Sequence, residues 1–154
     1  MRRREFITLL SGAATWSLAA LAQAPTMPVI GFLTIVSQGG PTPALPFFHR
    51  GLAELGYVEG SNVSVEIRYA EFHPERLPAL ASDLVKARAA LIVTASGLPA
   101  VLAAKAASAT VPIVFVMPTD PVQLGLVDSL NRPGGNLTGV AALNTPVLTK
   151  QIEL

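Results

Sequence analysis

The amino-acid sequence predicts an α/β domain built on a doubly wound, mainly parallel five-stranded sheet. Short apolar runs bounded by turn residues alternate along the chain with longer stretches of helical period, as βαβ units do. Apolar residues make up 51% of the chain but aromatic residues only 6%, so small aliphatic side chains fill the core, as in helices packed on a parallel sheet. The length of 154 residues gives room for one compact domain.

The first predicted unit starts with an apolar strand over residues 29–33. A helix is expected over residues 44–55, where Gly56 stops it. The second strand is expected over residues 63–69, where apolar and polar side chains alternate. That alternation indicates that one face of the strand is more solvent-exposed than the other, which is typical of a strand near the sheet edge.

The middle of the chain predicts two further units. A helix is expected over residues 74–88, with two prolines near its start, where a missing N–H costs little. Residues 91–94 then form a buried strand, the Ala-rich residues 99–107 form a strong helix, and residues 113–116 form the fourth strand.

The last third of the chain predicts a helix, a strand and another helix. An N-cap aspartate followed by a proline predicts a helix over residues 120–130. Residues 131–136 form a tight connection and residues 137–140 the fifth strand. A helix over residues 145–154 reaches the last residue without a stop signal, so we expect the sequence to be cut rather than finished. Right-handed crossovers then give the flavodoxin-like strand order 2-1-3-4-5.

The N-terminus has the pattern of a secretory leader. Three arginines precede a largely apolar stretch, which ends in the small-residue cleavage pattern of residues 20–22. Residues 3–8 resemble the twin-arginine export motif. The apolar run is shorter than the roughly 20 residues that a membrane span needs. We expect a signal peptide over 1–22, a linker over 23–27, a lobe over 28–154, a periplasmic location and no membrane span in the mature chain.

Composition argues against several classes of partner. Removal of the leader leaves eight basic and nine acidic residues and no basic cluster, so nucleic acid is not an expected partner. The chain has no cysteine, which excludes disulfides, Cys-ligated zinc and a thiol nucleophile. Neither GxGxxG nor a Walker A motif is present, and we expect no cofactor.

Polar side chains gather in the loops that follow the predicted strands. Ligands of open α/β sheets bind outside the carboxyl ends of the strands, so these loops predict a site for a polar small molecule. The side chains are Thr34, Ser37, Thr94, Ser96, Thr119 and Asp120. The sequence leaves two roles open for Asp120, capping alone or capping together with binding a ligand ammonium group, and Thr94 and Ser96 can also act as caps.

Nothing in the sequence arranges a catalytic or metal centre. His49 and His73 are expected on the side opposite these loops, as surface or helix-end residues, and neither has a serine and a carboxylate around it in sequence. Residues 71–75 contain metal-ligand types without a partner elsewhere and are interpreted as the solvated start of a helix. We therefore expect a binding protein and no enzyme.

Five stretches together cover nearly all of the chain after the leader. The most specific are TDPVQLGLV at residues 119–127 and LNRPGGNLTGV at residues 130–140. The others are VIGFL at 29–33, FHRGLAELGYVEG at 48–60 and RLPALA at 76–81. In these stretches the chain resembles the ABC transporter substrate-binding proteins, whose better-known members look like tryptophan- or aromatic-amino-acid-binding proteins.

The resemblance implies the N-terminal lobe of a type I periplasmic-binding-protein fold, cut before the second lobe. In this fold two lobes close on a small solute and deliver it to an ABC permease. It places ligand contacts in four loops, at Thr34, Ile35, Ser37, Thr94, Ala95, Ser96, Thr119, Asp120 and Asn144. An amino acid is one class of solute by analogy. Two alternatives stay open, a ligand-sensing lobe of a regulatory protein and a fragment without binding activity of its own. The regulator would need a DNA-reading motif where this chain has a leader.

Overall fold

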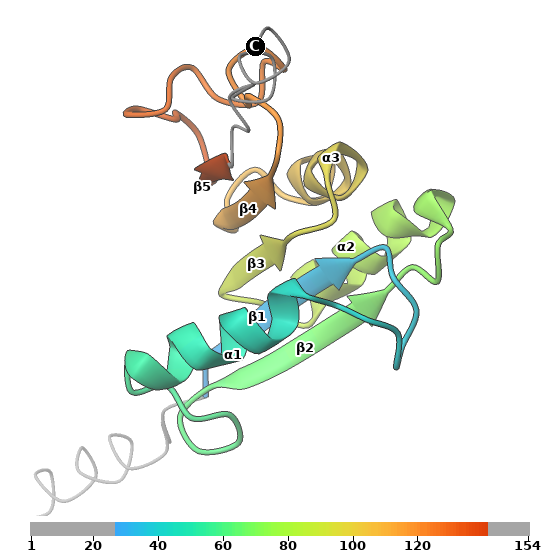
Figure 1. Ribbon diagram of the computed structural model, residues 1–154, viewed down its shortest axis with the longest axis vertical. Helices are drawn as coiled ribbons and strands as arrows, with labels where there is room; N and C mark the ends of the chain where they lie inside the picture. Colours follow the sequence, from blue (N-terminus) through green and yellow to red (C-terminus); the bar gives the residue numbers. More distant parts are fainter. Residues whose placement is uncertain (1–26, 142–154) are drawn as a thin grey trace, which may run out of the picture.

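A computed structural model of the protein describes residues 27–141, which form a five-stranded sheet whose neighbouring strands all pair in parallel (Figure 1). The strand order is β2-β1-β3-β4-β5, which confirms the predicted fold class and order. Its strands are β1 (Val29–Thr34), β2 (Ser64–Tyr69), β3 (Leu91–Thr94), β4 (Ile113–Met117) and β5 (Leu137–Ala141). The predicted leader and the predicted helix over residues 145–154 lie outside the described residues.

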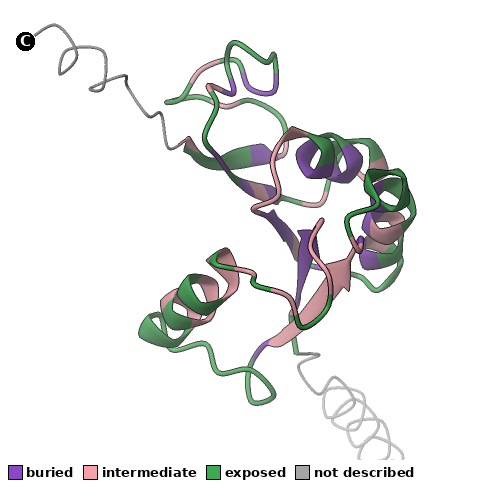
Figure 2. Ribbon diagram, turned by 45° about the vertical axis from the view of Figure 1, so that its right-hand side comes forward, coloured by how far each residue is buried: buried purple, intermediate pink, exposed green. Residues whose placement is uncertain are grey.

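Helices cover both faces of the sheet. They are α1 (Ala44–Glu54), the short 3-10 helix η1 (Pro74–Arg76), α2 (Leu77–Lys86) and α3 (Leu98–Ala107). Helix α1 lies on one face, whereas α2 and α3 lie together on the other (Figures 1 and 2). Within residues 27–141, no helix is long and apolar enough to cross a membrane.

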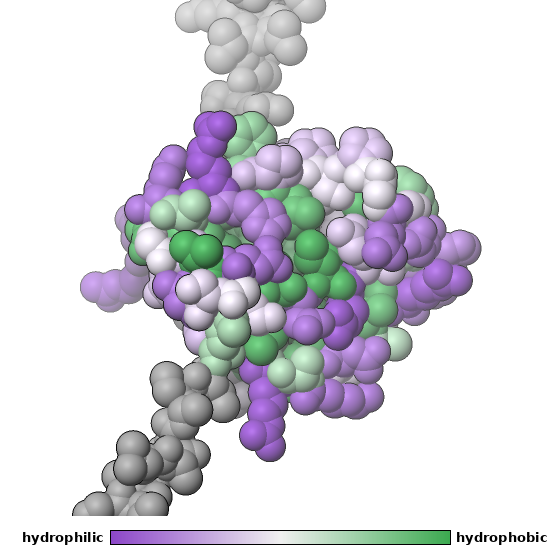
Figure 3. Space-filling view, turned by 90° about the horizontal axis from the view of Figure 1, so that it is seen from below, coloured by the Kyte–Doolittle hydropathy of each residue, from purple (hydrophilic) through white to green (hydrophobic). Residues whose placement is uncertain are grey.

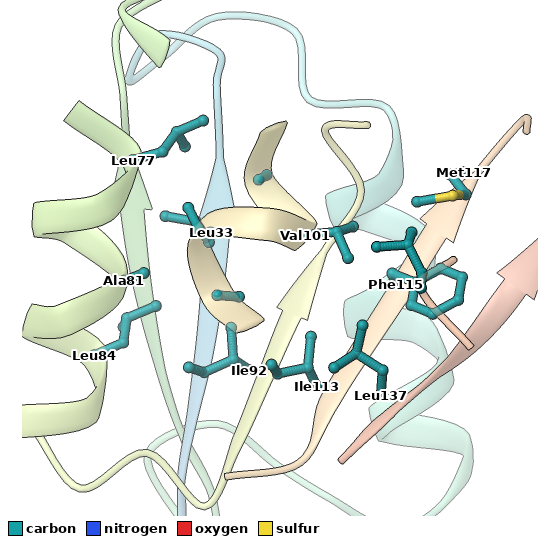
Figure 4. Packing of buried hydrophobic residues seen from close by; sticks show 14 of the residues in the cluster. Leu33, Leu77, Ala81, Leu84, Ile92, Val101, Ile113, Phe115, Met117 and Leu137 are labelled. Atoms are coloured by element: carbon teal, nitrogen blue, oxygen red, sulfur yellow. The ribbon is translucent and has the colours of Figure 1, made fainter. Parts of the chain in front are cut away.

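The larger core lies between the sheet and the pair α2 and α3. Leu84 of α2 and Val101 of α3 are fully buried against Ile92 and Phe115 of the sheet (Figure 4). A Cβ on Gly31 would stand 2.9 Å from the Leu84 side chain, so the missing side chain lets α2 approach β1 closely. Burial of this kind stabilises the fold by about 25 cal/mol for each Å² of apolar surface removed from water.

The face under α1 is covered over only part of its width. Phe32 of β1 packs against Phe48 of α1 with ring centroids 5.4 Å apart. Beyond α1, an apolar groove of about 470 Å³ runs along β3 and β4, and Val116 and Phe47 at its margin are exposed. Figure 3 shows one side of the molecule, where apolar residues gather in a patch bordered by hydrophilic ones.

The helix predicted over residues 120–130 is absent from the structure, and the prediction is wrong there. Irregular backbone bonds replace a helical ladder, with the Leu126 N–H donating to the Pro121 carbonyl at 2.9 Å and the Gly125 N–H to the Val122 carbonyl at 3.0 Å. Gly125 has a φ of 64°, in the left-handed region, which ends a helical turn. Leu126 and Val127 are nevertheless buried against the core, so this segment covers the sheet as turns.

Candidate functional site

The carboxyl ends of neighbouring strands meet at one edge of the sheet. Thr34, the last residue of β1, pairs in register with Tyr69, the last of β2, and Leu33 pairs with Thr94, the last of β3. The loops after β1 and β2 therefore lie side by side, as Figure 1 shows at the tips of these two strands. This edge is where an open parallel sheet binds its ligand.

Two hydroxyl groups join the loops after β1 and β3. The Thr34 and Ser96 hydroxyls lie 2.9 Å apart in a hydrogen bond, and the backbone N–H of Ile35 donates to the Ser96 hydroxyl at 3.0 Å. Thr34 is buried, whereas Ser96 and Ile35 remain half-buried. Three of the residues predicted for the site therefore meet in one hydrogen-bonded group.

Helix α3 begins immediately after this group. Gly97 is its N-cap, with a φ of 77°, and no side chain caps the helix. The capping roles open to Thr94 and Ser96 are therefore not used at this helix. The first N–H groups of a helix carry partial positive charge, and Pro99 lacks one of them in α3. The edge therefore combines hydroxyls with a helix end whose charge favours an anion.

Two further predicted residues of this loop lie deeper. Thr94 is fully buried, and its hydroxyl oxygen has no hydrogen-bond partner within the described part of the chain. Ala95 lines the apolar groove beside α1. The structure thus places Thr94 in the interior and Ala95 on the α1 face, whereas Ser96 takes part in the hydrogen-bonded group at the edge.

The loop after β2 contributes two residues that the sequence prediction missed. A carboxylate oxygen of Glu71 accepts the Gln38 N–H at 3.1 Å, and the Phe72 N–H donates to the Ile35 carbonyl at 2.6 Å. The Gln38 N–H, and next the Ser37 hydroxyl, lower the pKa of Glu71 below its usual range. The predicted strand order could have revealed both residues. Because β2 pairs in parallel with β1, the loop that follows β2 must lie at the same edge.

The loop after β4 carries the remaining described residues of the predicted site. A carboxylate oxygen of Asp120 accepts the Val122 N–H at 2.9 Å, so it stabilises a turn where the sequence predicted a helix cap. Thr119 is exposed and Asp120 half-buried. Asn144 lies outside the described residues.

The histidines lie nearer this edge than predicted. His73 follows β2 at its carboxyl end, with its Nδ1 2.8 Å from a Glu75 carboxylate oxygen. His49 lines, with Gly39 and Tyr69 among others, a cavity of about 350 Å³ beside the loop after β1. The prediction that both lie opposite the site is wrong, because it left the loop after β2 out of the edge. Among residues 27–141, no three acidic or histidine side chains are grouped to hold a metal ion.

This edge belongs to a fold shared with known binding proteins. Residues 29–154 match the family model described as ABC transporter substrate binding protein. The chain belongs to this family. The match confirms the family inferred from the sequence motifs.

A curated relative with a similar sequence is the tyrosine-binding protein of Clostridioides difficile strain R20291. The two are 33% identical over 112 residues, which are 73% of this chain and 32% of the relative. The chain thus spans about a third of the length of that substrate-binding protein.

Two solved structures share this fold over part of their length. One is the ligand-free, open structure of a substrate-binding protein with adhesive properties from Clostridium difficile, at a TM-score of 0.67 and 27% identity over 74% of this chain and 38% of that one. The other is an ABC domain in complex with L-Trp from Streptococcus pneumoniae, at a TM-score of 0.63 and 30% identity over 75% and 39%. Both belong to proteins much longer than the matched region.

Proposed function

We propose that this chain is the first lobe of the solute-binding component of an ABC import system and that it binds an amino acid at the carboxyl edge of its sheet. The observation that carries the proposal is the bonded group of Thr34, Ile35 and Ser96 directly before the N-terminus of α3. Hydroxyls and helix N–H groups suit a ligand carboxylate. In the same proposal, Asp120 and Thr119 lie one loop further along and face the ammonium group.

The relatives support an amino acid as the ligand. One is named a tyrosine-binding protein, and a solved neighbour holds L-Trp. Their greater length supports a second lobe that would complete a cleft and close on the ligand. Delivery to a membrane permease, export through the leader at residues 1–22 and a periplasmic location are parts of the same proposal, as is the absence of enzymatic activity.

Thermal denaturation of the 154-residue chain with a panel of amino acids tests the proposal. One lobe offers half a cleft, so we expect millimolar affinity and high ligand concentrations are needed. At ten times Kd, binding to the folded state adds about 1.4 kcal/mol of stability and raises Tm. The Ser96→Ala variant should lose this gain, whereas Ser82→Ala, on the exposed part of α2, should keep it. An unchanged Tm with every amino acid would contradict the proposal.

A further inference from the structure

The far part of the loop after β1 is held to the rest of the fold by one side chain. The near part is anchored by backbone, since the Ile35 carbonyl accepts the Phe72 N–H at 2.6 Å. Residues 37–41, the arm of this loop, follow and include two consecutive glycines. Within the described part of the chain, the arm is hydrogen-bonded outside its own loop only through the Glu71 carboxylate, which accepts the Gln38 N–H at 3.1 Å.

Packing does little to hold the arm in place. None of its residues is buried. Gly39 and Gly40 line a cavity of about 350 Å³ together with His49 of α1 and Tyr69 of β2, so open space adjoins the arm on that side. Glycines also leave the backbone more conformational freedom than other residues do. The Glu71 carboxylate is therefore the main constraint on where the arm lies.

The backbone at position 71 is costly for a residue other than glycine. Glu71 has a φ of 56°, in the left-handed region that glycine takes without a penalty. Strained residues that the surrounding structure holds in place are typical of ligand sites. Here the strain accompanies a contact that glycine could not make, because the side chain is what reaches the Gln38 N–H.

The contact is strong near neutral pH and involves a residue of the predicted site. The Gln38 N–H, and next the Ser37 hydroxyl, hold the pKa of Glu71 below its usual range. The carboxylate is therefore ionised, and an ionised acceptor makes a stronger hydrogen bond than a neutral one. Ser37 is one of the residues predicted to contact the ligand, so Glu71 acts on the site without being part of it.

We propose that Glu71 is a positioning residue of the ligand site, whose carboxylate holds residues 37–41 at the carboxyl edge of the sheet and presents Ser37 to the ligand. The inference rests on the proposed function. Glu71 restricts the arm before the ligand arrives and does not itself contact the ligand. Where the binding-competent arrangement is only partly populated, the apparent Kd rises by the inverse of the populated fraction.

NMR titration of the 154-residue chain with L-Trp, L-Tyr and L-Leu tests this inference on the parent and on three Glu71 variants. Glu71→Ala and Glu71→Gly both remove the carboxylate, but only glycine relieves the positive φ. We expect both to bind about three- to tenfold more weakly, although Glu71→Gly should have the higher Tm of the two. Glu71→Gln keeps an oxygen that accepts the Gln38 N–H and should bind within about twofold of the parent.

Glu75→Ala is the matched control, because it removes an equal charge a few residues further along the chain. The Glu75 carboxylate is hydrogen-bonded to His73 in its own segment, so its loss should leave Kd unchanged. Hydrogen exchange of the Gln38 amide, measured without ligand, reports the contact itself. Exchange should be faster than in the parent in Glu71→Ala and Glu71→Gly, and unchanged in Glu71→Gln and Glu75→Ala.

The outcomes separate this inference from the proposed function. If the parent binds and both Glu71→Ala and Glu71→Gly bind equally well, the inference is wrong and the proposed function stands. Equal weakening by Glu75→Ala also overturns it, because the effect would then come from charge alone. A loss that follows Tm, absent from Glu71→Gly, overturns it as well and leaves Glu71 a purely structural role. A parent chain that binds none of the three amino acids contradicts the proposed function and the inference together.

Discussion

The Thr34 and Ser96 hydroxyls are hydrogen-bonded at 2.9 Å although 62 positions separate them in the sequence. The pair ties the end of β1 to the loop between β3 and α3, and the Ile35 N–H completes it. Because neighbouring parallel strands end together, this contact follows from the strand order and needs no covalent link. It fixes the shape of the edge at which we place the ligand.

Loss of the Ser96 hydroxyl should destabilise the fold as well as the site. Ser96→Ala leaves the half-buried Ile35 N–H and the buried Thr34 hydroxyl without their partner, which costs about 1–3 kcal/mol. Urea denaturation measures this cost as a lower midpoint with an unchanged slope. Ser82→Ala, which removes a hydroxyl bonded to the Pro78 carbonyl on α2, should stay near the parent value. Equal effects of the two substitutions would show that the Ser96 contacts contribute little.

The Glu71 carboxylate should make stability depend on acid pH. Its pKa is lowered in the folded state by the Gln38 N–H and the Ser37 hydroxyl, so its ionised form favours folding. That contribution is fully present above the usual pKa of 4.5 and is lost as pH falls through the lowered value. Glu71→Gln should flatten the decline of Tm over this window relative to the parent. Parallel curves for the two proteins would refute the contact.

Two glycine substitutions should act in opposite directions. A Cβ on Gly139 of β5 would collide with the Phe115 carbonyl oxygen and stand 2.7 Å from its ring, so Gly139→Ala should cost about 1–3 kcal/mol by forcing β5 from β4. Gly51 lies inside α1 with open space around it, and Gly51→Ala should stabilise the chain by about 0.5–1 kcal/mol. Thermal melts measure both. A neutral Gly139→Ala would mean that β5 does not pack as closely as described.

Periodicity and turn residues were enough to predict the strands and their order. The apolar runs of β1, β3 and β4 differ from the predicted ranges by a residue at most, because buried parallel strands carry an unbroken apolar signal. The helix expected after Asp120 failed for a local reason. An aspartate before a proline can begin either a turn or a helix. Here the positive φ of Gly125 interrupts the helical conformation, and the Asp120 carboxylate stabilises a turn.

The candidate site was predicted in part. Hydroxyl-bearing residues after β1 and β3 were found by their position alone, and the structure joins Thr34 with Ser96. The sequence did not predict Glu71 and Phe72 as part of this edge. Their places depend on backbone conformation and on hydrogen bonds to the neighbouring loop, and residue type reveals neither of these. Thr94 shows the reverse difficulty, since its hydroxyl has the right chemistry and position but lies fully buried.

Mapping amide chemical shifts of the 154-residue chain during titration with L-Trp and L-Tyr tests the central claim most directly. We expect saturable shifts concentrated at Ile35, Ser96 and Leu98, the three positions whose N–H groups lie at or beside the bonded hydroxyls and the start of α3. Saturable shifts confined to the apolar groove beside α1, or to the opposite edge of the sheet, would contradict a ligand site at the carboxyl ends of the strands.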